Sequence, residues 1–305
     1  MQLPSRVTIC EVGPRDGLQN EARNVPTPDK IRLIEALADA GIQRMEATSF
    51  VAPKWIPNLA DAGEVLGGIR RRPGVTYAAL VPNLKGLERA LAARVDEAVI
   101  FLSASESHSR KNINKSIAEA LETYREVAGA VDQAGLRLKA AISTSFGCPY
   151  EGDVDPLTVV GIAMALVEMG VDEVGVADTT GMANPRQVFS LVSRLAEQVP
   201  IDMISLHFHD TRGSAVANVL AGLQAGVTIF DGAVGGLGGC PYAKGATGNV
   251  ATEDLVHMLH EMGIETGVNL EKLIACARLA QEIVGRPLES HVAKSGPVNH
   301  TGAGF

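Results

Sequence analysis

Short apolar segments rich in Val, Ile, Thr and Phe alternate along this chain with longer amphipathic segments rich in Ala and Leu. The short segments have the length and composition of buried strands, and the longer ones have the pattern of helices that cover a sheet. The pattern predicts eight strands, at residues 7–13, 44–50, 75–81, 97–103, 138–146, 173–179, 203–209 and 228–234. Strands that alternate with helices favour a parallel sheet.

A weak repeat marks the ends of four predicted helices. A glycine between two apolar residues precedes a strand at residues 40–42, 134–136, 169–171 and 225–227. Glycine at this place suits the left-handed residue that ends a helix. Eight strand–helix units in about 250 residues favour a closed barrel over an open nucleotide-binding sheet, which usually has fewer units and a glycine fingerprint. We therefore predict an α/β protein with a (β/α)8 TIM-barrel fold.

The predicted barrel accounts for most of the chain. We expect a single TIM-barrel catalytic domain over residues 1–305, with its core at about residues 7–265 and a C-terminal extension at residues 266–305. Within the extension, residues 269–285 have the pattern of one extra C-terminal helix, and residues 286–305 that of a short tail.

Composition excludes several classes of protein. Hydrophobic residues make up 46% of the 305 residues and charged residues 20%, which is ordinary for a globular protein. The formal net charge is −8 and no dense basic run exists, so we expect no nucleic-acid binding. No apolar stretch reaches the ~18 residues of a membrane span, and the first predicted strand begins too early for a targeting peptide. We expect a cytoplasmic protein of bacterial type that does not bind membranes.

Polar side chains gather where the predicted strands end. The active site of a TIM barrel lies at the carboxyl ends of its strands, so polar residues at that end are candidates for chemistry. A polar cluster that includes Arg15, Asp16 and Gln19 follows the first strand, and Glu46 and Ser49 lie in the second. Arg15 either neutralises an anionic group of a ligand or forms an ordinary ion pair with Asp16.

Two histidines on the seventh strand have metal-ligand spacing. His207 and His209 are two residues apart, so both side chains face the same side of the strand. The alternative, two unrelated core histidines, requires two separate sets of buried partners. Barrel closure brings Asp16 toward them, and Asn249 after the eighth strand offers a carbonyl oxygen. Such mixed oxygen and nitrogen ligands favour Mg²⁺ or Mn²⁺.

A glycine-rich segment at residues 235–249 follows the eighth strand and carries Cys240. It matches neither common phosphate-binding glycine motif, so it is either a flexible connection or a mobile lid. Cys10 and Cys276 fall in predicted elements, where cysteine is usually inert packing. Cys148 follows the fifth strand and stays a second candidate for chemistry. The four cysteines lack paired spacing, so we expect reduced thiols.

Residues 103–115 form a basic segment after the fourth strand, which we expect to be a loop that enters a helix. Arg110 and Lys111 in this segment are candidates for contacts with phosphates of a nucleotide-bearing substrate. A solvated helix start is an equally good interpretation of the same spacing.

At these residues the chain resembles the 3-hydroxy-3-methylglutaryl-CoA (HMG-CoA) lyase family of the DRE-TIM metallolyase superfamily. The resemblance spans residues 7–259. It rests on VGPRDGLQNE (12–21), TSFVAPKWIP (48–57), KNIN (111–114), CPYEG (148–152), HFHDT (207–211) and GLGGCPY (236–242). The last segment contains the lyase signature of the family.

The resemblance implies cleavage of HMG-CoA into acetyl-CoA and acetoacetate, a step of leucine breakdown. It implies that Asp16, His207, His209 and Asn249 bind a divalent cation, which also binds the carboxylate and hydroxyl of the acyl-CoA substrate. Metal coordination acidifies that hydroxyl. Asp16 is the implied base, and His207 is the alternative.

The resemblance implies roles for further residues. Glu46 is expected to orient the cluster, Arg15 to stabilise the enolate of acetyl-CoA, and Cys240 to protonate the enolate carbon. Gln19, Ser49 and Glu253 are expected to contact the substrate or to support the metal ligands. A homodimer is a family-level expectation.

One departure from the family leaves the acyl group open. Many members have Tyr-Gly-Gln after the HFHDT segment, whereas this chain has Arg212, Gly213 and Ser214. Alternatives are a sibling lyase acting on another 3-hydroxy-3-alkylglutaryl-CoA or on citramalyl-CoA, and a non-catalytic acyl-CoA-binding barrel. A condensing relative, such as isopropylmalate synthase, usually needs a longer C-terminal region.

Overall fold

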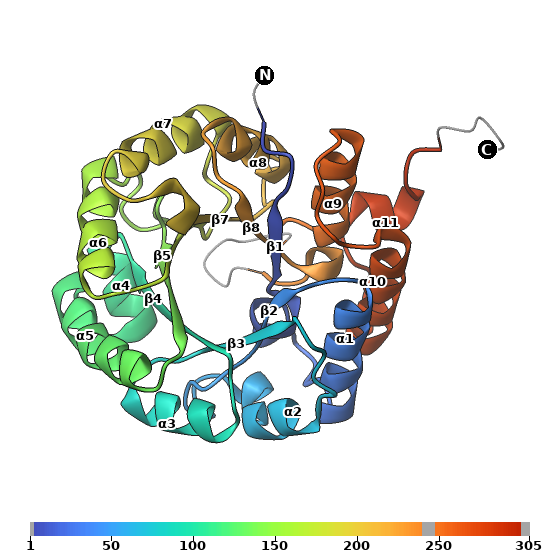
Figure 1. Cartoon of the computed structure of the whole chain (residues 1–305), viewed down its shortest axis with the longest axis horizontal. Helices are drawn as coiled ribbons and strands as arrows, with labels where there is room; N and C mark the ends of the chain where they lie inside the picture. Colours follow the sequence, from blue (N-terminus) through green and yellow to red (C-terminus); the bar gives the residue numbers. More distant parts are fainter. Residues whose placement is uncertain (1–2, 240–247, 300–305) are drawn as a thin grey trace.

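Eight parallel strands form a closed barrel, as the sequence pattern predicts (Figure 1). The structure is a computed structural model that describes residues 3–239 and 248–299. The strands pair in sequence order, and β8 pairs with β1 to close the barrel. They are β1 (Thr8–Glu11), β2 (Arg44–Ser49), β3 (Thr76–Leu80), β4 (Glu97–Ser103), β5 (Arg137–Ser143), β6 (Glu173–Asp178), β7 (Ile204–Phe208) and β8 (Ile229–Gly232).

Helices surround the barrel and bury an apolar layer against the outside of the sheet. They are α1 (Thr27–Asp39), α2 (Ala62–Gly68), α3 (Leu84–Ala92), α4 (Glu106–Ile113), α5 (Ile117–Gln133), α6 (Pro156–Glu168), α7 (Pro185–Ala196), α8 (Ala215–Gln224), α9 (Thr252–Glu261), α10 (Leu270–Val284) and α11 (His291–Ser295). The four glycines of the repeat follow α1, α5, α6 and α8 with φ between 66° and 99°, as predicted for helix ends. In the described part of the chain, no helix is both long and apolar enough to cross a membrane.

The C-terminal extension contains one more helix than predicted. The expected helix is present as α10, with the Asn269 side chain accepting from Lys272 N at its start and Gly285 in a left-handed conformation at its end. The expected tail contains the short helix α11. Asp254 of α9 accepts hydrogen bonds from His291 N and Val292 N at the start of α11. This contact is tertiary, so local patterns did not reveal the helix.

Several local expectations were wrong. The first and eighth strands end at Glu11 and Gly232, two residues earlier than expected. The basic segment at residues 103–115 contains the helix α4, so Arg110 and Lys111 lie in the last turn of a helix and not in a loop. This helix is short and polar, and it therefore lacks the apolar periodicity on which the prediction depended. The fifth strand ends at Ser143, because the next residue, Thr144, turns the chain with φ +57°.

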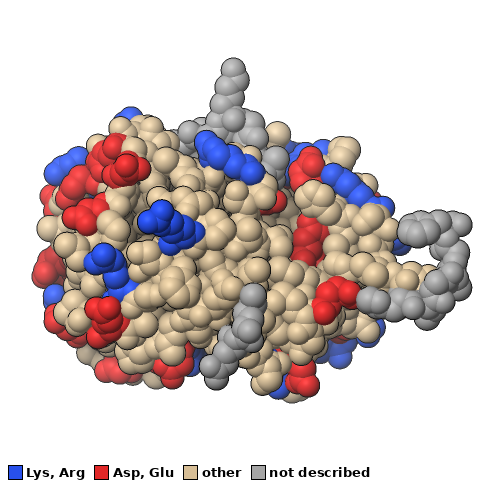
Figure 2. Space-filling view, turned by 90° about the horizontal axis from the view of Figure 1, so that it is seen from above, with Lys and Arg blue, Asp and Glu red and all other residues tan. Residues whose placement is uncertain are grey.

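Acidic and basic side chains are interspersed on the outside of the protein. Figure 2 shows both signs scattered over the face that it presents, with wide uncharged areas between them. This face has no continuous basic surface of the kind that binds a polyanion.

The interior of the barrel is unusually charged. Arg44, Glu97 and Glu173 are buried near its amino-terminal end, and the guanidinium of Arg44 pairs with both carboxylates. Lys139 is buried beside them, with Nζ 3.6 Å from Glu173 Oε1. Charges inside a protein must be paired, so the geometry of this network is tightly constrained.

Candidate metal and active site

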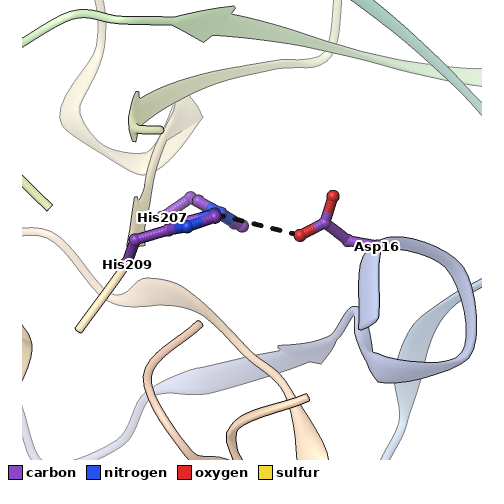
Figure 3. Close-up of side chains that lie close together, drawn as sticks. All are labelled: Asp16, His207 and His209. Carbon is purple, nitrogen blue, oxygen red and sulfur yellow. Dashed lines mark ion pairs between the residues drawn. The ribbon is translucent and has the colours of Figure 1, made fainter. Parts of the chain in front are cut away.

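Asp16, His207 and His209 lie together at the carboxyl end of the barrel (Figure 3). One ligand atom from each residue lies within 4.8 Å of the others. His209 Nε2 is 3.9 Å from Asp16 Oδ2, and the two imidazole centroids are 5.2 Å apart. The three side chains converge as barrel closure predicts, because β8 pairs with both β7 and β1.

A single helical turn, η1 (Gly13–Gly17), positions Arg15 and Asp16 directly after β1. The buried carboxylate of Glu11 holds the start of this turn by accepting from Gly13 N at 2.7 Å. The same Oε1 accepts from Val234 N at 2.9 Å, at the start of the turn η4 (Val234–Gly236) after β8. Glu11 thus connects the two turns that lead into the site.

Asn249 completes a set of four side chains. It pairs with His209 in an isolated antiparallel bridge, and its Nδ2 donates to Asp16 Oδ2 at 2.8 Å. Its Oδ1 is buried and has no hydrogen-bond partner among the described residues. A buried carbonyl oxygen without a partner is destabilising. Asn249 Oδ1 therefore fits the role of a cation ligand.

Asp231 orients His207, a role that the sequence reasoning missed. Asp231 Oδ2 lies 3.2 Å from His207 Nδ1, which leaves Nε2 of the ring for a cation. Lys139 Nζ donates to Asp231 Oδ1 at 2.8 Å. Asp231 and Lys139 are charged residues within apolar strand segments. A buried charge in a strand is a signal that the sequence contained.

Glu46 orients Arg15. Arg15 Nε donates to Glu46 Oε2 at 2.6 Å, and its Nη1 donates to Asp16 Oδ1 at 2.8 Å. The guanidinium therefore has a fixed direction beside the metal-ligand set, where it is suited to an anionic group.

The electrostatics of Asp16 and His209 favour cation binding at neutral pH, whereas those of His207 favour its protonated form. Burial alone would raise the pKa of Asp16, but Arg15 and the two histidines lower it to about 2. Burial and the neighbouring His207 lower the pKa of His209 to about 4. Burial opposes charge on His207 as well, yet Asp231 raises its pKa overall. An ionised carboxylate and a neutral imidazole are the forms that bind metals.

The charge of the interior also suits a divalent cation. With both histidines neutral, carboxylates exceed cations by two in the cluster of ion pairs that connects the site to the barrel interior. Its members are Arg15, Arg44 and Lys139 against Asp16, Glu46, Glu97, Glu173 and Asp231. A cation with two positive charges would balance this excess.

The remaining candidates lie around this centre. Ser49 is buried at the end of β2, and its Oγ accepts from Val51 N at 3.2 Å. Glu253 on α9 is fully buried, and both oxygens of its carboxyl group accept from Gly235 N at 3.0 Å. Gln19 is partly buried after η1, and its backbone oxygen accepts from Asn58 Nδ2. Ser49 and Glu253 thus support backbone turns near the site.

Arg110 and Lys111 follow β4, at the same end of the barrel. Arg110 is exposed, with Nε 3.8 Å from Glu106 Oε2, and Lys111 Nζ lies 3.5 Å from the ring centroid of Tyr150. Both side chains are exposed, in the last turn of the helix that follows the carboxyl end of β4.

The cysteines differ in their surroundings. Cys148 is buried, and its Sγ lies 3.0 Å from Ser105 Oγ. Cys10 and Cys276 are buried, as expected for packing residues. Cys240 lies outside the described residues. Among the described residues, the hydrogen-bond contacts of Cys148 Sγ are with Ser105 Oγ and Tyr150 N, and none is with Asp16, His207 or His209.

Comparisons with known proteins find HMG-CoA lyases among the relatives of this chain. Residues 6–280 match the HMGL-like family. The chain is 53% identical to hydroxymethylglutaryl-CoA lyase YngG of Bacillus subtilis, over 95% of this chain and 97% of the relative. It is 48% identical to the 3-hydroxy-3-isohexenylglutaryl-CoA/hydroxy-methylglutaryl-CoA lyase of Pseudomonas aeruginosa, over 97% and 98%.

A solved structure of a relative carries ligands. An HMG-CoA lyase from Acinetobacter baumannii, in complex with coenzyme A and 3-methylmalate, superimposes with a TM-score of 0.94. That protein is 41% identical, and the match covers 98% of each chain.

Proposed function

This chain belongs to the HMGL-like family, and we propose that it is a metal-dependent lyase that cleaves HMG-CoA into acetyl-CoA and acetoacetate. The observation that carries the proposal is the cluster of Asp16, His207 and His209 at the barrel mouth, beside the unpartnered Oδ1 of Asn249. These four residues would hold a divalent cation, for which we propose Mg²⁺ or Mn²⁺. When bound, such a cation acidifies the tertiary hydroxyl of the substrate.

The proposed reaction begins with loss of the hydroxyl proton. Asp16 takes this proton, and His207 is the alternative base. The oxygen electrons then form the ketone of acetoacetate as the carbon–carbon bond breaks, and the bond electrons pass to the enolate of acetyl-CoA. Arg15, held in direction by Glu46, stabilises the enolate oxygen.

Protonation of the enolate carbon completes the reaction. We assign this step to Cys240 on the basis of the signature segment at residues 236–242. An ordinary thiol with a pKa of about 8.5 stays mostly protonated at pH 7 and can donate to a carbanion.

The outer part of the substrate extends to the rim. We propose that Arg110 and Lys111 bind the phosphates of coenzyme A, and that Gln19 and Ser49 contact the acyl part. Glu253 supports the η4 turn by accepting from Gly235 N. We further propose that the protein is a cytoplasmic homodimer and that it acts in leucine breakdown. Size-exclusion chromatography with light scattering tests the dimer.

A longer acyl chain is the second candidate substrate. The Pseudomonas relative is named for a 3-isohexenyl substrate as well as for HMG-CoA. Arg212, where this chain departs from the family pattern, donates to the backbone oxygens of Thr180 and Gly181 at 3.0 and 2.8 Å. Arg212 therefore stabilises the loop that follows β6, next to the site.

The direct test is acetyl-CoA formation from HMG-CoA, 3-hydroxy-3-isohexenylglutaryl-CoA and citramalyl-CoA, each with Mg²⁺, Mn²⁺ or EDTA. We expect metal-dependent cleavage with preference for HMG-CoA. Preference for another thioester would assign a sibling specificity, and binding of all three without cleavage would support a non-catalytic barrel.

A further inference from the structure

Lys139 places a buried ammonium group in the centre of the barrel, below the metal-ligand set. Its side chain is 1% exposed and extends from β5 toward the opposite wall. Gly175 on β6 leaves room for it, because a Cβ at that position would lie 3.2 Å from Lys139 Cε. Burial would lower the pKa of this lysine, but Asp231 and the other nearby acidic groups raise it well above its usual value. The ammonium group therefore stays charged.

The first contact of this ammonium leads to His207. Nζ donates to both oxygens of Asp231, at 2.8 and 3.1 Å. Asp231 Oδ2 is also the partner of His207 Nδ1. Lys139 thus fixes the carboxylate that sets the direction of a metal-ligand imidazole.

The second contact leads to Asp16 from the other side. Nζ lies 3.9 Å from Glu46 Oε1, at the outer limit of an ion pair. The other oxygen of Glu46 accepts from Arg15, and Arg15 donates to Asp16 Oδ1. One ammonium group therefore stands at the junction of two chains of contacts, and each chain ends on a metal-ligand residue.

We propose that Lys139 is a positioning residue that sets the orientations of His207 and Asp16 together, through Asp231 on one side and through Glu46 and Arg15 on the other. This inference rests on the proposed metal site. It does not depend on which acyl-CoA is cleaved.

Arg44 provides a matched control. It is the other buried cation of the barrel interior below the site, and among the described ion pairs its partners are Glu97 and Glu173. Loss of either cation leaves buried carboxylates without a partner, which destabilises the fold. Of these two cations, Lys139 is the one that contacts Asp231 and Glu46, whereas Arg44 is linked to it only through their shared partner Glu173. Loss of Lys139 should therefore affect the metal ligands more than loss of Arg44.

The test compares Lys139→Met with Arg44→Met in the full chain. We expect both variants to unfold at lower temperature. We expect Lys139→Met to weaken Mn²⁺ binding, measured by titration calorimetry without substrate, by roughly 10–100-fold, as for other residues that orient metal ligands. Arg44→Met should weaken Mn²⁺ binding much less, because Arg44 shares Glu173 with Lys139 but has no ion pair with Asp231 or Glu46 among the described residues. Equal Mn²⁺ affinities in the two variants would overturn the proposal.

A second pair of variants keeps the test decisive if Lys139→Met does not fold. Combining Lys139→Met with Asp231→Asn removes the ion pair without leaving the Asp231 charge buried alone. We expect the double variant to bind Mn²⁺ more weakly than Asp231→Asn alone, because the Glu46 side also loses its ammonium. Equal affinities would refute the double role. Mn²⁺ binding by the wild-type chain without cleavage of any thioester would reject the proposed function and leave this inference standing.

Discussion

His207 Nδ1 lies 3.2 Å from Asp231 Oδ2, so a carboxylate on β8 determines which nitrogen of a β7 imidazole is available to a cation. We predict that Asp231→Ala weakens Mn²⁺ binding by roughly 10–100-fold, because the His207 ring loses its orienting partner. Titration calorimetry measures this effect. Asp254→Ala is the control, since it removes a carboxylate that serves α11 outside the site. Similar losses in both variants would argue against a specific role for Asp231.

Arg15 tests the assignment of the enolate-stabilising group. Its guanidinium contacts Glu46 and Asp16 at once, and a lysine cannot reproduce this geometry. We predict that Arg15→Lys lowers kcat by on the order of 10²–10³ with a much smaller change in KM. Steady-state kinetics with HMG-CoA measure both parameters. Arg286→Lys, which alters another Arg–Glu pair, is the control, and a loss confined to KM would count against the role.

Cys240 and Cys148 allow a matched comparison of two thiols, each followed by Pro and Tyr. We predict that Cys240→Ala lowers kcat by about 10²–10⁴ and retains substrate affinity, because it removes a proton donor and no binding group. Cys148→Ala should keep most of the activity, since that buried thiol interacts with Ser105. Single-turnover kinetics and substrate titration separate the two effects. Substantial turnover by Cys240→Ala would reject Cys240 as the donor.

Glu253 predicts a dependence of stability on pH. Burial raises its pKa from 4.5 to about 8, and the nearby Glu11 and Asp254 add to the rise. Between pH 4.5 and about pH 8, Glu253 keeps its proton in the folded protein but releases it in the unfolded chain. The free energy of unfolding therefore falls as pH rises. The glutamine in Glu253→Gln has no proton to release in this range, so the variant lacks this part of the pH dependence. We predict that the wild type loses on the order of 2–4 kcal/mol relative to the variant between pH 5 and pH 8.

Urea unfolding of both proteins at pH 5, 6, 7 and 8 measures this difference. Glu11, whose pKa burial raises to about 7, contributes with the same sign in both proteins, so the difference between the two curves reports Glu253 together with its interaction with Glu11. Glu271→Gln, an exposed change at the start of α10, should follow the wild type at every pH. Parallel stability curves for the wild type and Glu253→Gln would contradict a protonated Glu253.

The periodicity of the chain by itself determined the barrel. Eight apolar segments with helical segments between them favour a closed barrel over an open sheet, and the structure has the closed order from β1 to β8. The spacing of His207 and His209 and the place of Asp16 after β1 were also sufficient, because strand alternation and barrel closure make them converge.

Only the tertiary structure decided how these residues are held. Asp231, Lys139 and Glu46 come from three different strands, and their contacts depend on side chains that cross the barrel interior. The helix α11 likewise depends on Asp254 of α9. Local sequence patterns report which way a residue faces along its own strand or helix. The direction and partner of a buried charge depend on groups far away in the chain, because it is stabilised only where the fold brings an opposite charge or a donor to it.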